Sequence, residues 1–333
     1  MSRVTLRDVA SRAGVSTAAT SQALNDRGSL RPETRERIKA IAAELGYAPN
    51  RHAAALRSGR TMTVGFVLAG GSLQDGRRAL HRARQLDALV QAGAQRGFTV
   101  TVLPDTRPDL LTGAQLDALY FPDPADDRAI LREAVAAGIP VAASDLSVPG
   151  GLTIRTGYAA AVRAGLGLLA GAGAASIGFL VDDSEVPRDQ VGESAYLAWS
   201  ALNGRAPLVA RVDAGRRRLI PAVHELLDAG ADAIFAYCEE GPEIYLHLET
   251  LGLVIPRDLQ LLTLCTGDGA LDERLAITHV RLYPERAADV LFGALDLGDP
   301  GGDPPADAGP AATAPGLLSI DLPFDIVRGA TTR

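Results

Sequence analysis

The sequence predicts an N-terminal all-α helix-turn-helix unit followed by an α/β body that is divided into two lobes. The first observation is charge. Residues 1–60 contain 11 basic and 5 acidic residues, a net charge of +6, whereas the other 22 basic and 35 acidic residues give −13. The second is the apolar pattern, which has the spacing of short helices before residue 61 and alternates strands with helices after it. A basic unit on an acidic body is typical of a protein that binds nucleic acid through that unit alone.

The composition is that of a globular protein with more than one domain. The chain has 333 residues, of which 47% are hydrophobic and 22% are charged. Its two cysteines are too few for a disulfide framework, and its first residues lack the apolar stretch of a secretory signal. No apolar run reaches the ~18 residues that a membrane span needs. We therefore expect a cytoplasmic protein that does not contact a membrane.

Helix caps and glycines define the unit that we call the head, residues 1–48. Thr5 and Asp8 have the spacing of a capping box at the start of the first helix. Gly14 is expected to end that helix in the left-handed conformation, which glycine adopts without steric cost. Ser16 is a good N-cap for the second helix. The predicted helices are 5–13, 16–25 and 32–45.

The second helix is expected to leave one face outside the small core of the head. The residues of this face are short or polar: Thr17, Ala18, Ser21, Gln22 and Asn25. Gln22 can form two hydrogen bonds with adenine, and the methyl groups of Thr17 or Ala18 can contact a thymine methyl. The alternative is an ordinary solvated helix face. The basic excess and the turn before the helix favour a face that binds DNA.

Residues 5–25 have the sequence pattern T-L-x-D-V-A-x-x-A-G-V-S-x-x-x-x-S-x-x-L-N, which is unlikely to arise by chance. Together with "ETRERIKAIAAELGYAPNRHAAALRSGRT" it resembles the LacI/GalR family of bacterial transcription regulators, without a gap over the first 61 residues. The resemblance implies base contacts by Thr17, Ala18 and Gln22. It also implies phosphate contacts by four residues: Thr5, Ser16, Ser21 and Asn25.

Residues 49–61 resemble the hinge segment of that family, which is disordered off DNA and forms a short helix in the minor groove. Leu56 matches the leucine that wedges between the central base pairs, and Asn50 and Arg51 belong to the same DNA-binding segment. The segment is alanine-rich and too short to be a stable helix alone in water, which agrees with folding on binding. The alternative for Leu56 is a linker residue that packs against the body.

Two residues of the head depart from the family pattern. Thr20 stands where the family usually has valine inside the small core, and Arg31 replaces the usual hydroxyl cap before Pro32. We expect each departure to lower the stability of the head, and neither lies on the face that contacts bases.

The body alternates strands and helices from residue 62 onward, which indicates parallel sheets covered on both faces. The family resemblance is weaker here. It implies a periplasmic-binding-protein-like α/β fold of two Rossmann-like lobes joined by three crossovers. The expected bounds are 62–156 and 284–316 for the first lobe, and 157–283 and 317–333 for the second.

A small ligand is expected between the lobes, at the carboxyl ends of the strands. The resemblance implies a small effector, often a sugar, and Asp145 matches one of the polar positions that hold it. The other positions depart, because Cys238 and Glu239 replace an Asn-Asp pair and Cys265 replaces an aspartate. An ordinary sugar ligand is therefore not expected. The candidate effector residues are Ser72, Asp145, Trp199, Tyr237, Cys238, Glu239 and Cys265.

Other chemistry has little support in the sequence. Cys238 and Cys265 can be a redox pair or a soft-metal site, but small fillers of a changed pocket are the favoured alternative. The five histidines are scattered and form no His-x-x-x-His or serine-elbow pattern. We therefore expect no enzyme activity, no cofactor and no metal.

The sequence thus predicts a regulator that binds a near-palindromic operator as a homodimer, more often in the sense of a repressor, under the control of a small ligand. The alternative is an effector-independent or protein-controlled DNA-binding protein whose pocket has decayed. An enzyme or transport protein on the same fold is disfavoured, because the head is intact and a catalytic constellation is lacking. The C-terminal residues carry no heptad pattern, so tetramers through a terminal coiled coil are not expected.

Overall fold

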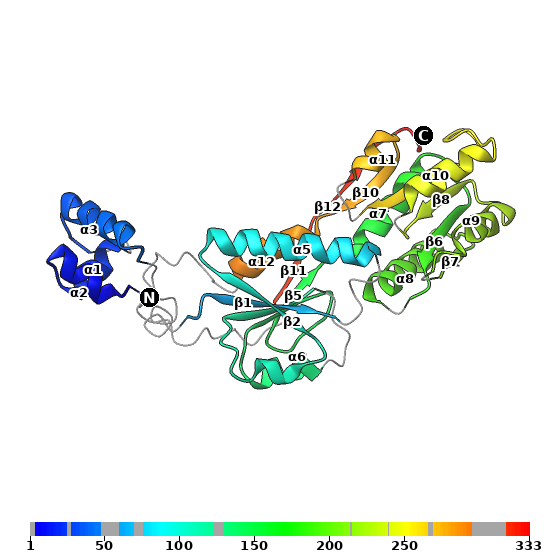
Figure 1. Ribbon diagram of the computed structural model, residues 1–333. Helices are drawn as coiled ribbons and strands as arrows, with labels where there is room; N and C mark the ends of the chain where they lie inside the picture. The colour runs from blue at the N-terminus through cyan, green and yellow to red at the C-terminus, as the bar shows by residue number, and fades with distance from the viewer. Residues whose placement is uncertain are drawn as a thin grey trace.

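The computed structural model shows a small helical head beside a larger body of two lobes (Figure 1). The structure describes residues 4–24, 28–47, 60–69, 76–122, 129–184, 186–213, 215–238, 240–265, 269–294 and 318–333. Six of the predicted site residues lie outside these ranges: Asn25, Asn50, Arg51, Leu56, Ser72 and Glu239.

The described part of the head consists of α1 (Leu6–Ala13), α2 (Thr17–Leu24) and α3 (Pro32–Glu44). Both halves of the predicted capping box are present at Thr5 and Asp8, and Gly14 ends α1 with φ 65°. A core of small and branched side chains holds the three helices together. It is formed by Val9, Ala13, Ala23, Ile38 and Ala42.

The two departures in the head have different outcomes. Thr20 is completely buried, but its hydroxyl donates to the carbonyl oxygen of Ser16 at 3.0 Å. The polar group is therefore satisfied within its own helix, and the expected loss of stability is offset by that bond. Arg31 provides no side-chain cap to α3, as expected, and Pro32 fills the first helical position.

The first lobe is a parallel sheet with the strand order β11-β5-β4-β3-β1-β2. Its strands are β1 (Thr63–Leu68), β2 (Thr99–Pro104), β3 (Ala118–Phe121), β4 (Val141–Ser144), β5 (Leu152–Arg155) and β11 (Leu318–Asp321). Two apolar layers cover it: α5 (Gly76–Gln95) and α12 (Ala287–Ala294) lie on one face, and α6 (Ala129–Ala136) lies on the other. The 3-10 helices Pro108–Leu111 and Pro284–Arg286 complete the lobe.

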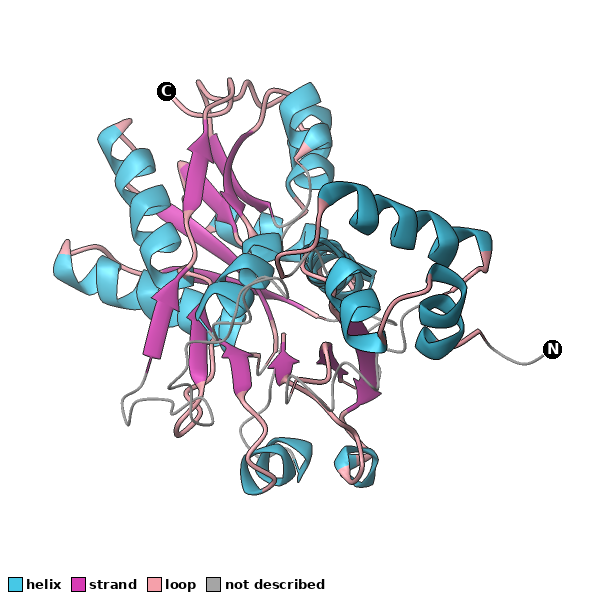
Figure 2. Ribbon diagram, turned by 90° about the vertical axis from the view of Figure 1, so that its left-hand side faces the viewer, coloured by secondary structure: helices cyan, strands magenta, loops and turns pink. Residues whose placement is uncertain are grey.

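The second lobe has the strand order β12-β10-β9-β8-β6-β7. Its strands are β6 (Ile177–Asp182), β7 (Leu208–Val212), β8 (Ala233–Ala236), β9 (Gln260–Cys265), β10 (Thr278–Leu282) and β12 (Phe324–Val327). All are parallel except β12, which pairs antiparallel to β10 at the edge. The helices are α7 (Tyr158–Gly171), α8 (Pro187–Leu202), α9 (Leu219–Asp228), α10 (Gly241–Thr250) and α11 (Ala270–Arg274). Figure 2 shows the strands inside the body with helices around them.

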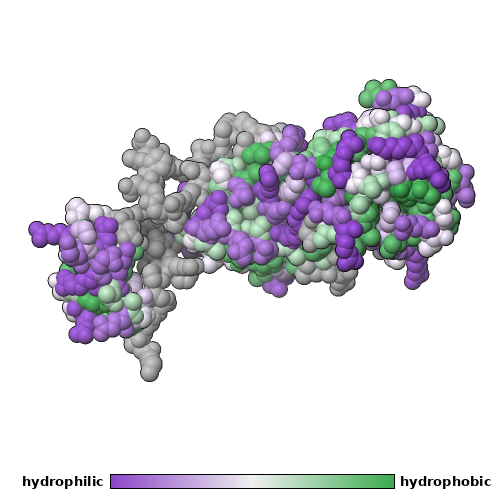
Figure 3. All heavy atoms as spheres, turned by 90° about the horizontal axis from the view of Figure 1, so that it is seen from above, coloured by the Kyte–Doolittle hydropathy of each residue, from purple (hydrophilic) through white to green (hydrophobic). Residues whose placement is uncertain are grey.

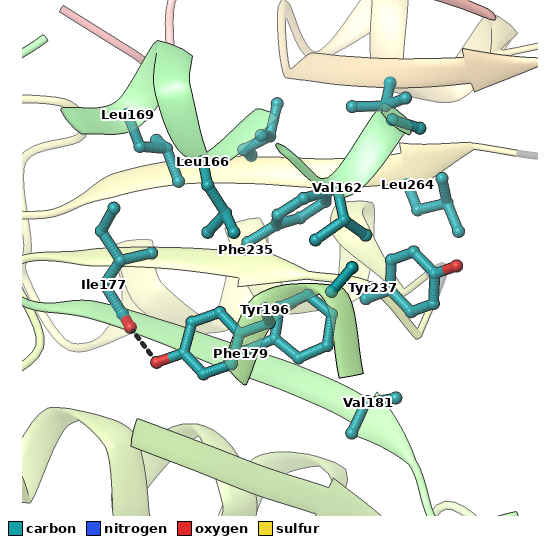
Figure 4. Close-up of a cluster of buried hydrophobic side chains, with 14 of the residues drawn as sticks. Val162, Leu166, Leu169, Ile177, Phe179, Val181, Tyr196, Phe235, Tyr237 and Leu264 are labelled. Carbon is teal, nitrogen blue, oxygen red and sulfur yellow. Dashed lines mark hydrogen bonds between the residues drawn. The ribbon is translucent and has the colours of Figure 1, made fainter. Parts of the chain in front are cut away.

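Aromatic side chains fill the core between the second sheet and helices α7 and α8 (Figure 4). Phe179 stacks on Tyr196, with ring centroids 4.8 Å apart and an interplanar angle of 11°. The hydroxyl of Tyr196 donates to the carbonyl oxygen of Ile177 at 2.8 Å, so this buried polar group is satisfied. This packing holds α7 and α8 against the second sheet.

Three crossovers join the lobes, as the resemblance implies. They leave β5 near Thr156, β10 near Tyr283 and β11 near Leu322. One boundary differs from the prediction, which placed 317–333 in the second lobe. Residues Leu318–Asp321 instead form β11 and pair with Leu152–Arg155 in the first sheet, because the return crossover comes after this strand.

Candidate DNA-binding face and interlobe pocket

Helix α2 turns its small buried residues inward and its predicted binding face outward. Thr20 and Ala23 are buried, whereas Thr17, Ala18 and Gln22 are exposed. Ser21 is half-buried on the same side. The exposed side chains are short or carry an amide, so the backbone of α2 can approach a nucleic-acid groove closely. Figure 3 shows that the surface of the head is mostly hydrophilic in this view.

Two predicted phosphate-binding residues already serve as helix caps. The Oγ of Ser16 accepts the N–H of Ala19 at 3.1 Å. The hydroxyl of Thr5 donates to the Oδ2 of Asp8 at 2.7 Å, and the Thr5 N–H donates to the same oxygen at 2.8 Å. These hydrogen bonds lower the pKa of Asp8. The hydroxyl of Thr5 must therefore break its hydrogen bond with Asp8 before it can donate to a phosphate.

Gly28 provides the space in which the Gln22 side chain lies. A Cβ added at Gly28 would come 2.7 Å from the Oε1 of Gln22, and Gly28 has φ +75°. The position therefore favours glycine for two independent reasons, steric and conformational. Gly28 thus confines the Gln22 amide, which is predicted to bond adenine.

A cavity of about 830 Å³ lies where the carboxyl ends of β4, β5 and β11 meet the start of α7 and one residue of α8, Val191. Asp145 is the predicted effector residue that lines it. The carboxylate of Asp145 accepts the Thr156 N–H at 2.8 Å and the Thr156 hydroxyl at 2.6 Å. This size lies within the range of small-molecule pockets. The cavity therefore has both lobes as walls and is large enough for a metabolite.

The charges in this cavity are unequally compensated. Arg155 forms two hydrogen bonds with Asp321, at 2.6 and 3.2 Å, across paired positions of β5 and β11. Arg163 is the one charged residue in the sequence of α7, is exposed, and forms no hydrogen bond or ion pair with the described residues. Gly157, the residue before α7, provides no side-chain cap. The cavity wall at α7 is therefore electropositive.

The bacterial regulatory proteins of the lacI family have a family model that matches residues 5–50. The match covers the head and the first residues of the hinge segment. The sucrose operon repressor of Klebsiella pneumoniae is 49% identical over 69 residues, 20% of this chain and 21% of that protein. The lactose operon repressor of Escherichia coli (strain K12) is 34% identical over 158 residues, 44% of this chain and 42% of that protein. The matches thus span less than half of these relatives.

The fold of the whole chain has a counterpart among solved structures. A lac repressor dimer bound to operator and the anti-inducer ONPF has a TM-score of 0.73, covers 99% of both chains and is 20% identical. At this identity the likeness shows the fold alone. It confirms the predicted helix-turn-helix head with a two-lobed α/β body, and the relatives are regulators rather than enzymes.

The carboxyl edge of the second sheet is closed by an ion-pair network. Arg188, at the start of α8, bonds Asp182 at 2.8 Å and Asp189 at 2.7 Å. Arg216 also pairs with Asp182 and approaches Glu240 at 3.4 Å. The side chains of Arg188 and Asp182 are each 13% exposed. These donors and acceptors already bond one another, so a sugar would have to displace them.

Three predicted effector residues support this edge or lie in the core. Tyr237 is buried, its hydroxyl donates to the Arg188 carbonyl oxygen at 3.2 Å, and burial raises its pKa. Cys238 is buried in the apolar cluster under α9 and α10, and Cys265 is buried at the end of β9. Neither thiol is part of a disulfide. None of the three lines the interlobe cavity.

Trp199 lies at the opposite edge of the second lobe from the one predicted. The guanidinium of Arg205 lies 5.4 Å from the centre of its ring, and the same guanidinium donates to the Ala174 carbonyl oxygen ahead of β6. Trp199 is thus near the amino ends of the strands, because three turns of α8 separate it from the start of that helix. The structure does not bring it to the cleft.

The charge of Arg188 in the second lobe acts on His81 of α5 in the first lobe, which the sequence did not indicate. Desolvation lowers the pKa of His81 to about 3, and the positive charges of Arg188, Arg82 and Arg84 act in the same direction.

No helix within the described ranges is both long and apolar enough to cross a membrane.

Proposed function

We propose that this protein is a dimeric transcriptional regulator, of the repressor type, that binds a near-palindromic operator. The main observation in support of this proposal is the outward face of α2, where Thr17, Ala18 and Gln22 are exposed on a head with a net positive charge. Helix α2 enters the major groove, and Gln22 bonds adenine. One head contacts few base pairs, so two heads related by two-fold symmetry supply the needed site length.

The hinge residues complete this proposal. Leu56 enters the minor groove and kinks the DNA between the two half-sites, and Asn50 and Arg51 hold the backbone. The proposal for these residues rests on the sequence resemblance.

The experiment selects duplexes from a random library and measures binding by fluorescence anisotropy. We expect a footprint with two-fold symmetry. Gln22→Ala should weaken specific binding by roughly tenfold or more, equivalent to ~1–3 kcal/mol, and leave nonspecific binding unchanged. Ala43→Ser, at an exposed position of α3, is the matched control and should change neither. Equal affinity for selected and random duplexes would contradict the proposal.

The interlobe cavity is the proposed effector site, and its charges favour a small amphipathic molecule with one anionic group. Arg163 and the first-turn N–H groups of α7 bind the anion, and Tyr158 and Phe324 contact the apolar part.

Screening by thermal shift should show that small carboxylates raise the Tm more than neutral sugars do. Arg163→Gln should remove that preference, whereas Arg132→Gln, outside the cavity lining, should retain it.

The second candidate function is regulation without a small ligand, and the closed network of Arg188, Asp182 and Asp189 favours it. The same screen separates the two functions. If no small molecule raises the Tm and the protein still binds its operator, regulation without a small ligand is supported.

A further inference from the structure

We propose that His224 and His247 form a binding site for one divalent transition-metal ion of the Zn²⁺, Ni²⁺ or Cu²⁺ class. His224 lies on α9 and His247 on α10, and 23 positions separate them in the sequence. Their Nε2 atoms are 3.1 Å apart, and their ring planes meet at 78°. The site is on the outer side of the second lobe. It does not involve the interlobe cavity or the head, and it does not depend on the proposed function.

The fold positions both imidazoles before any ion arrives. Helix α9 connects β7 to β8 and helix α10 connects β8 to β9, so the two helices are neighbours on one face of the second sheet. Val223 and Leu248, each next to one of the histidines, are completely buried in the same apolar cluster. The histidines themselves are half-buried at the rim of that cluster. Such anchoring reduces the entropy lost when both side chains bind one ion.

The geometry fits an ion between the two nitrogens. With Nε2 atoms 3.1 Å apart and Zn–N distances of roughly 2.05 Å, the N–metal–N angle is about 98°. This angle lies between the octahedral and the tetrahedral values, so both coordination types fit. Imidazole nitrogens suit Zn²⁺, Ni²⁺ and Cu²⁺, whereas Mg²⁺ and Ca²⁺ prefer oxygen ligands.

The two imidazoles are the protein's contribution to the site. In the described part of the chain no third His, Cys, Asp or Glu joins them in a metal-binding group. The nearest acids in sequence have their own partners: Glu225 pairs with Arg218, and Glu249 accepts the hydroxyl of Tyr245 at 2.9 Å. Water therefore completes the coordination, and the ion is exchangeable. The competing explanation of the 3.1 Å contact is a single hydrogen bond from one neutral imidazole to the other.

Titration calorimetry of the full chain, freed of any affinity tag, with NiCl₂ tests the site. We expect saturable binding of one Ni²⁺ per chain and a rise in Tm of several degrees, while MgCl₂ gives neither. A glutamine can still hydrogen-bond the remaining histidine but is a poor ligand for Ni²⁺. His224→Gln and His247→Gln should therefore each weaken Ni²⁺ binding at least tenfold, and His81→Gln, in the first lobe, should not.

Absence of saturable Ni²⁺ binding, or equal binding by the wild type and both glutamine variants, would overturn the proposal and leave the hydrogen bond as the explanation. Electron paramagnetic resonance of the wild type loaded with one equivalent of Cu²⁺ gives a test that needs no variant to fold. Two equivalent nitrogens on the copper would support the site, and one or none would contradict it.

Discussion

The carboxylate of Asp145 holds Thr156 by both the backbone N–H and the hydroxyl, at 2.8 and 2.6 Å. Asp145 follows β4 and Thr156 begins the first crossover, so this contact fixes the chain where it leaves the first lobe. Asp145 also has φ 56°, a conformation that asparagine and aspartate tolerate better than most residues. The residue assigned to the effector is therefore also a structural element of the crossover.

Asp145→Ala should lower the free energy of unfolding by about 2 kcal/mol, because two donors of Thr156 lose a charged acceptor. Thr156→Val removes only the hydroxyl bond and should cost less. Urea unfolding of the two variants and of the double variant measures their coupling. If the two losses simply add, the contact does not fix the crossover as described.

The network around Arg188 predicts a larger effect. Arg188→Ala leaves Asp189, whose side chain is 1% exposed, without its guanidinium, and should cost roughly 3 kcal/mol. Arg211→Ala is the matched control, because the Arg211–Glu193 pair is exposed on the arginine side and should be worth less than about 1 kcal/mol. Urea unfolding distinguishes them. Equal losses would show that the Arg188 network is no more important than a surface pair.

His81 predicts how stability depends on pH. The folded protein keeps His81 neutral down to about pH 3, whereas the unfolded chain takes up its proton near pH 6.5. The unfolded state therefore binds more protons between these values, and this contribution to stability falls as the pH is lowered from about 6.5 toward 3. His81→Gln should make the free energy of unfolding less dependent on pH in that window. An unchanged slope between pH 7 and pH 5 would contradict the assignment.

Two glycines of the head give a matched pair for testing how Gln22 is positioned. Gly28 and Gly46 have φ +75° and +64°, but only a Cβ at Gly28 meets another group, the Gln22 amide. Both alanine variants should lose roughly 1 kcal/mol or more of head stability to backbone strain. Only Gly28→Ala should in addition weaken specific DNA binding, because it displaces Gln22. Equal operator affinities of the two variants would show that Gln22 does not need this space.

The head could be predicted almost completely from the sequence, because its signals are local. The capping box of Thr5 and Asp8 and the glycine after α1 act within a few residues, and both are present. The hydroxyl bond of Thr20 is also local, but comparison with the valine usual in the family pointed to a loss of stability instead. Most strands of the body follow from apolar runs. The four residues of β11 join the first sheet rather than the expected second lobe, because pairing with a strand far away along the chain decides which sheet a short strand joins.

The sequence by itself determined the resemblance of the head to the lacI family, the helices of the head and the alternation of the body, since helix caps, glycines and apolar periodicity act over one or two turns. Only the tertiary structure decided which side chains meet. It placed Trp199 at the far edge of the second lobe, enclosed Arg188 between two aspartates and brought His224 within 3.1 Å of His247. Such contacts depend on how neighbouring helices pack on a sheet, and no spacing along the chain encodes that distance.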